Sequence, residues 1–155
     1  MSTIQFKMTT TATPEQFIAG LTDFGPGRDK LFGNSTDQYL KVHKIGSNYA
    51  DVTEGSGGIW ERLTYNWSDP THIVLTTTDS NLWGGRSGHT YTLKRLPNGL
   101  TDIDVEIVRD GKNIKGKLLG AFLGVAGKGQ LKKWFANTLK AIEARNHEVA
   151  EAAKA

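Results

Sequence analysis

The first residues of the chain have the hydrophobic pattern of a half-buried strand followed by a helix. Apolar and polar side chains alternate over Ile4–Thr10, a two-residue period that places the apolar ones on one face of a strand. In the segment Thr13–Gln16, a threonine, a proline and a glutamine stand at the N-cap, first and third positions of a helix. The pattern predicts a short helix ending before Gly25-Pro26-Gly27, and a second short helix over Arg28–Leu31.

Six further runs of strand-like sequence fill the middle of the chain, and clusters of turn residues separate them. In the last run, Ile103, Val105 and Ile107 alternate with acidic residues, which predicts a sheet with one solvated and one covered face. The predicted strands are Tyr39–Ile45, Tyr49–Glu54, Ile59–Trp67, Ile73–Asp79, His89–Arg95 and Thr101–Val108.

The final third of the chain has helical periodicity. Leu131, Phe135, Thr138 and Ile142 recur at helical spacing, and lysines lie mostly on the other side. The preceding segment, Leu118–Gly127, is apolar all round, and Gly127-Lys128-Gly129 at its end predict either a bend or a separation into two helices.

The order of these elements predicts an α+β helix-grip fold. Its parts are a seven-stranded curved antiparallel sheet, two short N-terminal helices and one long C-terminal helix over the concave face. A helix closing a strongly curved sheet leaves space that commonly becomes a ligand cavity. With 155 residues, we expect one domain over 1–150 and a frayed tail over 151–155.

Composition narrows the class of protein. Hydrophobic residues make up 37% and charged residues 23% of the chain, as in ordinary soluble domains. The absence of cysteine excludes disulfides and thiolate metal sites, and it favours a reducing cytoplasm. The N-terminal sequence lacks the pattern of a signal peptide, and the longest apolar run is about half the ~20 residues that a membrane span needs.

Several strings resemble the START-like (SRPBCC) superfamily, which includes polyketide cyclases, lipid-transfer domains and plant ligand carriers, and in particular its small actinobacterial polyketide cyclase/dehydrase-like members. The resemblance spans nearly the whole chain. It implies the helix-grip fold and a cavity for an apolar molecule, but no shared catalytic motif, because members of the superfamily differ in function. The residues that carry it are Leu21–Pro26, Ala50–Gly55, Trp60–Pro70 and Asp79–Asn81.

Aromatic and apolar residues on the predicted strands and helix are the candidate ligand-binding residues. Aromatic side chains can line an apolar chamber and orient a ligand with their polar edges, although each could equally be plain core. The predicted ligand-binding residues are Tyr39, Leu63, Tyr65, Trp67, Leu75, Thr77, Trp83, Tyr91, Ile103, Val105, Leu118 and Phe122.

The candidate catalytic residues are Glu61, Asp79 and His43. Alternation along the strands places Glu61, Thr77 and Asp79 toward the cavity. Such carboxylates could exchange protons beside a ketone, as a cyclase requires. They could instead be rim charges or ion pairs that fix the strands.

Other chemistries have little support in the sequence. The four histidines show no metal-binding spacing, and no serine lies in a nucleophile elbow. The glycine-rich segments match no phosphate-binding pattern, so we expect neither a metal nor a cofactor.

Charge is concentrated near the C-terminus. The segment 109–140 carries a net charge of +7, whereas the whole chain carries +3. These lysines could form a solvated helix face or assist docking on an anionic surface. Around the apolar segment, residues 115–133 are candidates for contact with a membrane or a second subunit, unless the N-terminal helices cover them. Nucleic-acid binding is not expected, because no recognition motif is present.

Together these observations favour a binding or carrier protein for a lipid, polyketide or similar apolar molecule, without chemistry of its own. The alternatives are a cyclase/dehydratase-type enzyme that uses a cavity carboxylate, histidine or tyrosine, and a membrane-surface or protein-interaction module.

Overall fold

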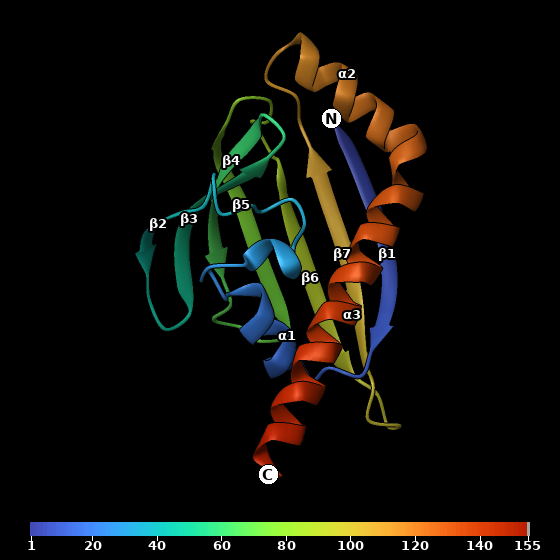
Figure 1. The fold of residues 1–155 in the computed structure, drawn as a ribbon. Helices are drawn as coiled ribbons and strands as arrows, with labels where there is room; N and C mark the ends of the chain where they lie inside the picture. Colours follow the sequence, from blue (N-terminus) through green and yellow to red (C-terminus); the bar gives the residue numbers. More distant parts are fainter. Residues whose placement is uncertain (155) are drawn as a thin grey trace.

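Seven antiparallel strands form one curved sheet in the computed structural model, which describes residues 1–154 (Figure 1). Across the sheet the order is β1-β7-β6-β5-β4-β3-β2, so the N-terminal strand lies beside the last one. The six strands predicted in the middle of the chain are confirmed. The strands are β1 (Ser2–Thr10), β2 (Lys41–Ile45), β3 (Tyr49–Ser56), β4 (Ile59–Asn66), β5 (His72–Ser80), β6 (Gly88–Arg95) and β7 (Thr101–Arg109).

The two N-terminal helices differ from each other. Helix α1 (Pro14–Leu21) begins with the predicted capping box, in which the Thr13 side chain accepts from the Gln16 backbone and the Gln16 side chain accepts from the Thr13 backbone. The second element, η1 (Arg28–Lys30), is a single 3₁₀ turn instead of a helix.

The C-terminal third is one continuous helical stretch in three parts. Helix α2 (Ile114–Phe122) passes through a π-helical turn, η2 (Leu123–Gly127), into the long helix α3 (Lys128–Ala153). The predicted bend therefore occurs through a π turn, and the axis changes direction there (Figure 1). Helix α3 extends through Ala153, into the segment 151–155 that we expected to fray, and Ala155 lies outside the described residues.

The middle of α3 packs on the concave face of the sheet. Phe135 stacks on Tyr91 of β6, with ring centroids 5.8 Å apart, and meets Phe6 and Phe17 edge-on at 5.9 and 6.1 Å. Burial of such aromatic side chains contributes much of the apolar stabilisation of a small domain. The architecture confirms the predicted α+β helix-grip fold.

A β-bulge interrupts the pairing of β4 with β5. Leu63 pairs with Thr77 but Arg62 pairs with Asp79, so Thr78 has no partner on β4. An extra residue reverses the alternation of side chains beyond it. Thr77 and Ser80 are therefore buried, whereas Asp79 faces solvent.

The start of α2 is fixed by close backbone packing. A Cβ atom at Gly116 would lie 2.2 Å from the carbonyl oxygen of Leu82, so only glycine permits this approach. Trp83 also forms an isolated bridge with Gly111, just before the helix. None of the helices in the described part of the chain combines the length and apolar character needed to cross a membrane.

Candidate functional site: a cavity between the sheet and the C-terminal helices

A cavity of about 720 Å³ lies between the sheet, the segment around η1 and the C-terminal helices. Volumes of this size are typical of small-molecule sites. Most of its wall is apolar, but two groups of charged side chains also reach it. The apolar wall includes Phe6, Leu21, Phe32, Leu63, Leu75, Trp83, Tyr91, Val105, Ile107, Leu119, Leu123, Leu131 and Phe135.

The first charged group, called here the Arg28 network, is buried. Glu54 of β3 accepts hydrogen bonds from Arg28 Nε and Ser35 Oγ, each at 2.7 Å, and from the hydroxyl of Tyr65. The Arg28 side chain is only 1% exposed, and its guanidinium lies 4.7 Å from the ring centroids of both Phe24 and Phe32.

The same network sets the protonation state of Tyr65. Burial, reinforced by the Glu54 carboxylate, holds the pKa of Tyr65 well above its usual value. The phenol stays neutral and donates to the carboxylate. Because every member is satisfied within the network, its role is to fix the η1 segment to the sheet.

The second group, the Glu61–Arg109 pair, is more open to the cavity. Arg109 of β7 donates to both carboxylate oxygens of Glu61 at 3.1 Å, and the Thr77 hydroxyl donates to Glu61 Oε2 at 2.8 Å. The side chains of Glu61 and Arg109 are 13% and 10% exposed. Burial alone would raise the pKa of the Glu61 carboxyl, but the Arg109 charge outweighs it and holds that pKa well below its usual value.

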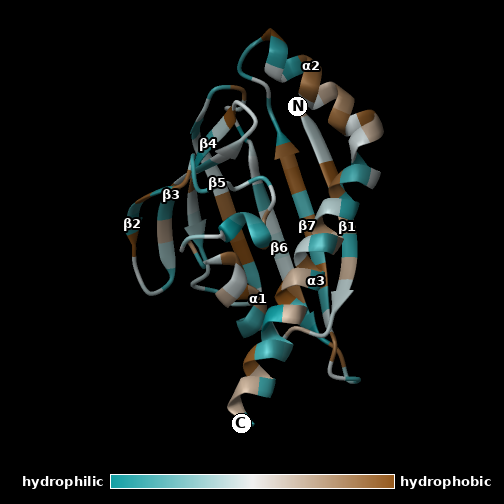
Figure 2. Cartoon of the chain, in the orientation of Figure 1, coloured by the Kyte–Doolittle hydropathy of each residue, from teal (hydrophilic) through white to brown (hydrophobic). Residues whose placement is uncertain are grey.

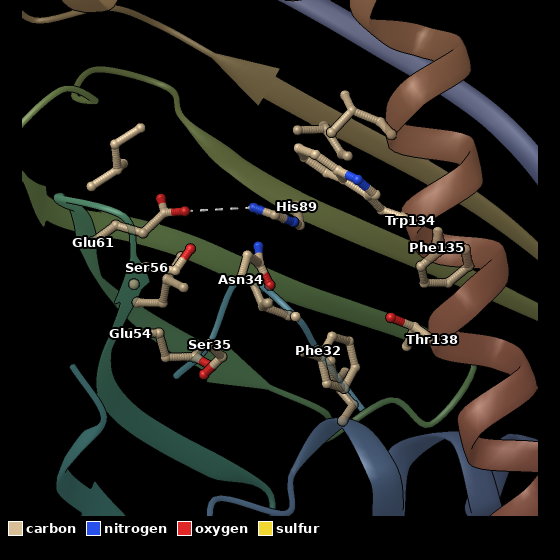
Figure 3. Close-up of a pocket in the computed structure, with 18 of the residues that line it drawn as sticks. Phe32, Asn34, Ser35, Glu54, Ser56, Glu61, His89, Trp134, Phe135 and Thr138 are labelled. Atoms are coloured by element: carbon tan, nitrogen blue, oxygen red, sulfur yellow. Dashed lines mark hydrogen bonds and ion pairs between the residues drawn. The ribbon is translucent and has the colours of Figure 1, made fainter. Parts of the chain in front are cut away.

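His89 completes this group. Its Nε2 atom lies 2.8 Å from Arg109 Nη2. The same atom lies 3.9 Å from Glu61 Oε1 (Figure 3). Arginine can only donate, so Nε2 accepts and the ring proton is assigned to Nδ1. The 3.9 Å separation from Glu61 is too long for a hydrogen bond.

Tyr91 supplies an unused polar atom in the cavity wall. Burial is the main cause that raises the pKa of its phenol above the usual value, which keeps the hydroxyl protonated. Within residues 1–154, neither the Tyr91 hydroxyl nor His89 Nδ1 has a hydrogen-bond partner. The cavity thus offers hydrogen-bond donors next to the Glu61–Arg109 pair.

Polar and aromatic side chains also reach the cavity from the η1 segment, the β3–β4 turn and α3. Asn34, Ser56 and Asn137 are among its lining residues, together with Trp134, whose side chain is 54% exposed. Figure 3 shows Asn34, Ser56, His89 and Trp134 around one shared space.

Six of the predicted ligand-binding residues lie in the cavity wall, and six do not. In the wall are Leu63, Tyr65, Leu75, Trp83, Tyr91 and Val105. Outside it are Tyr39, Trp67, Thr77, Ile103, Leu118 and Phe122.

The residues outside the wall have other surroundings. The Tyr39 hydroxyl accepts a hydrogen bond from the Gly58 backbone at 2.8 Å, and Trp67 packs against the core beyond the end of β4. Thr77 lies behind Glu61, and Ile103 is fully buried in the core.

The cavity-facing side of the α2–η2 segment differs from the expected one. Leu118 and Phe122 are 68% and 61% exposed on its outer side. Leu119 and Leu123 line the cavity instead.

Two of the three catalytic candidates are outside the cavity. The bulge between β4 and β5 turns Asp79 outward, where it pairs with Lys112 at 3.4 Å. His43 lies on the exposed edge strand β2 and contacts Thr53 Oγ1 at 2.7 Å. Of the three, only Glu61 lies where strand alternation predicted it, and it accepts hydrogen bonds from Arg109 and Thr77.

Sequence reasoning missed most of the polar residues of the site. Glu54 continues the buried face of Ala50 and Val52 on β3, and Arg109 continues that of Ile103–Ile107 on β7. A charged residue that extends an apolar period was the available signal. No such signal marks Arg28, because it lies in an irregular segment.

Two further features concern the surroundings of the cavity. Over residues 1–154, no three His, Asp or Glu side chains gather as a metal site would require.

The apolar segment 118–127 is not covered by the N-terminal helices, since α1 packs against the far half of α3 near Ile142 (Figure 1).

Comparison with solved structures shows the same fold in several proteins of low sequence identity. TTHA0849 from Thermus thermophilus matches with a TM-score of 0.69 and 12% identity, over 92% of this chain and 98% of its own. A START superfamily protein from Mycobacterium smegmatis matches at 0.66 and 10%, over 96% and 99%. The Zhui aromatase/cyclase from Streptomyces sp. R1128 matches at 0.66 and 13%, over 97% and 96%.

These likenesses show that the chain has the START-like fold, as its sequence resemblance implied. No family model matches the sequence, and no curated protein matches it.

Proposed function

We propose that this protein binds and carries an apolar small molecule, such as a lipid or a polyketide, whose polar end contains an oxygen acceptor. The observation that carries this proposal is a 720 Å³ cavity with a mainly apolar wall, into which Tyr91 and His89 bring free donors. The fold supports it, because START-like neighbours include a START superfamily protein and an aromatase/cyclase. A cytoplasmic location remains a prediction from the sequence.

The polar end of the ligand follows from the donors. Arg109 has satisfied Glu61 at both oxygens, so the pair is locally neutral and does not demand a charged ligand. The Tyr91 hydroxyl and His89 Nδ1 can donate to a carbonyl, carboxylate or phenol oxygen. We expect such an oxygen beside Tyr91, with the apolar body of the ligand along Leu63, Leu75 and the inner side of α3.

Native mass spectrometry of the purified protein, followed by organic extraction, tests this proposal. We expect the wild-type protein to retain an apolar species one to one. Val105→Trp should lose it, because Val105 is 1% exposed and lines the cavity. Val42→Trp is the matched control, since Val42 is 41% exposed on β2 and should leave retention unchanged. Anilinonaphthalene sulfonate serves as a fluorescent probe if the protein is purified empty.

The result that would overturn the proposal is equal binding by the two variants, provided that circular dichroism shows both folded. Failure of the wild-type protein to bind the probe, fatty acids and aromatic polyketides would overturn it as well.

A second function, acid–base catalysis of a cyclase/dehydratase type, is favoured by one observation. The Tyr91 phenol and His89 lie on adjacent inward positions of β6, with rings 6.4 Å apart, next to a carboxylate. Glu61 is a poor base there, because its lowered pKa reflects a stabilised anion. Loss of turnover with retained ligand in Tyr91→Phe or His89→Gln would establish the enzyme, and retention without turnover in wild type supports the carrier.

A further inference from the structure

Four large apolar side chains form a continuous exposed row on the outer side of the α2–η2 segment. Ile114, Leu118, Phe122 and Val125 are 78%, 68%, 61% and 92% exposed. Spacings of four, four and three residues place them on one side of a helix. Scattered exposed apolar residues are normal, but a contiguous patch on a folded domain marks an interaction surface. We call these four residues the α2 stripe.

The fold holds the α2 stripe outward. On the opposite side, Gly116 packs against the Leu82 backbone, and a Cβ atom at Gly120 would lie 3.5 Å from the Trp83 ring. Leu119 and Leu123 face the cavity from the same segment. Rotation of α2 to bury the stripe would break these contacts, so its exposure is built into the structure.

Lysines surround the α2 stripe. The exposed side chains at 115, 117, 128, 132 and 133 have no acidic partner within 4.0 Å among the described residues. The sequence from 111 to 142 contains no aspartate or glutamate. Figure 2 shows teal in the first turn of α2, mainly brown and tan in the rest of α2 and η2, and teal again at the start of α3.

We propose that the α2 stripe and these five lysines dock the protein on an anionic phospholipid surface. Apolar side chains can enter the boundary between headgroups and acyl chains while lysines contact the headgroup charges. Near such a surface each lysine strengthens binding about fivefold. Trp134, half exposed on the following helix, is of the kind enriched at membrane interfaces.

Charge decides against a second copy as the occupant. A two-fold symmetric contact through the α2 stripe would bring two identical sets of lysines together. Because residues 111–142 include no aspartate or glutamate, repulsion between the two sets of lysines would oppose association, whereas an anionic lipid surface would attract them.

Docking would also place one wall of the cavity at the lipid surface, because α2 and η2 carry the stripe outside and Leu119 and Leu123 inside. A ligand could then exchange between membrane and cavity. This last step rests on the proposed function, but docking itself does not.

Flotation with vesicles of equimolar phosphatidylcholine and phosphatidylglycerol tests the docking surface. We expect the wild-type protein to float with these vesicles at low salt, but not with pure phosphatidylcholine vesicles or at ~1 M salt, where the Debye length is about 3 Å. Lys115→Gln with Lys117→Gln should weaken binding about 25-fold. Lys41→Gln with Lys44→Gln, which lowers the charge equally on β2, should change it little.

A second pair of variants tests the contribution of the apolar side chains to vesicle binding. Val125→Ser should weaken vesicle binding at least severalfold, whereas Val149→Ser, at a 64% exposed site on the far end of α3, should not. Both sites are exposed, so both variants should remain folded.

Three results would overturn the docking proposal. They are absence of flotation with anionic vesicles, equal loss in test and control variants, and a dimer in light scattering that Val125→Ser dissociates. The cavity is tested separately, because Val125→Ser should still retain ligand and Val105→Trp should still float.

Discussion

Replacing Glu54 by glutamine tests whether the Arg28 network stabilises the domain. The substitution keeps the shape of the side chain but removes its charge. In the native protein this carboxylate accepts from Arg28, Ser35 and Tyr65. Glutamine leaves the Arg28 guanidinium, 1% exposed, without a counter-charge.

The structure gives the size of the effect. Breaking a buried ion pair by removing one partner costs about 3–5 kcal/mol, because the other charge is left unpaired. Here the Asp23 carbonyl at 2.7 Å and the rings of Phe24 and Phe32 still stabilise Arg28. We therefore expect the free energy of unfolding to fall by about 3 kcal/mol, which lowers the Tm by roughly 6–12 °C in a chain of this size.

Urea unfolding followed by circular dichroism measures this change, and Glu15→Gln is its control. Glu15 also pairs with an arginine, Arg95 at 2.5 Å, but the two side chains are 66% and 60% exposed. Exposed pairs contribute little, so the control should unfold like the wild type. Equal, small effects of the two substitutions would refute the assignment of stability to the network.

A double-mutant cycle separates the interaction between Arg28 and Glu54 from the other effects of each substitution. Arg28→Met in the Glu54→Gln background removes the unpaired charge, so the double variant should lose less than the sum of the two single variants. A coupling of about 1–3 kcal/mol is expected. Strict additivity would show that the two side chains do not act on each other.

Three further predictions concern the pair in the cavity, a helix cap and two glycines. Because the folded pKa of Glu61 lies below its ordinary value of 4.5, the pair's stabilisation is present at neutral pH and is lost as the pH falls below that value. Glu61→Gln should flatten the dependence of the urea midpoint on pH between about 6 and 3, and an unchanged slope would contradict the ion pair. Thr13→Ala should lower the free energy of unfolding by about 1 kcal/mol in the same assay, through loss of the cap of α1; no change would show that the cap is dispensable. Gly116→Ala should destabilise the protein strongly, since its Cβ would lie 2.2 Å from the Leu82 carbonyl oxygen. Gly129→Ala meets open space and should stabilise the protein by about 0.5–1 kcal/mol. Thermal melts that rank the two variants the other way would refute the packing described for α2.

Periodicity was sufficient for the fold because most strands have one buried face. β7 alternates without interruption from Thr101 to Arg109, and its predicted and observed bounds differ by one residue. The capping box at Thr13 likewise marked the start of α1. These signals are local, so they can be recognised in the sequence without knowledge of the tertiary structure.

The site was harder to predict because it depends on contacts between distant segments. Asp79 was expected in the cavity from simple alternation, but the bulge at Thr78 reverses the face of the sheet to which the following side chains point. Arg109 and Glu61 are 48 residues apart, and nothing in either local sequence indicates the pair. The η1 segment has no periodicity at all, so Arg28 could be placed only by the structure.

The π-helical turn η2 has a consequence for changes of chain length. Such a turn contains about one residue more than an α-helical turn, and each α-helical residue rotates the chain by about 100°. The π turn at Leu123–Gly127 therefore takes up one extra residue without the rotation that this residue would add in a regular helix, and Gly120 and Phe135 both face inward. Deleting one residue there would restore a regular helix and keep the two halves in phase, whereas five α-helical residues in its place would turn α2 by about a quarter turn relative to α3. The π turn thus decides which side of α2 meets the solvent when α3 is seated on the sheet.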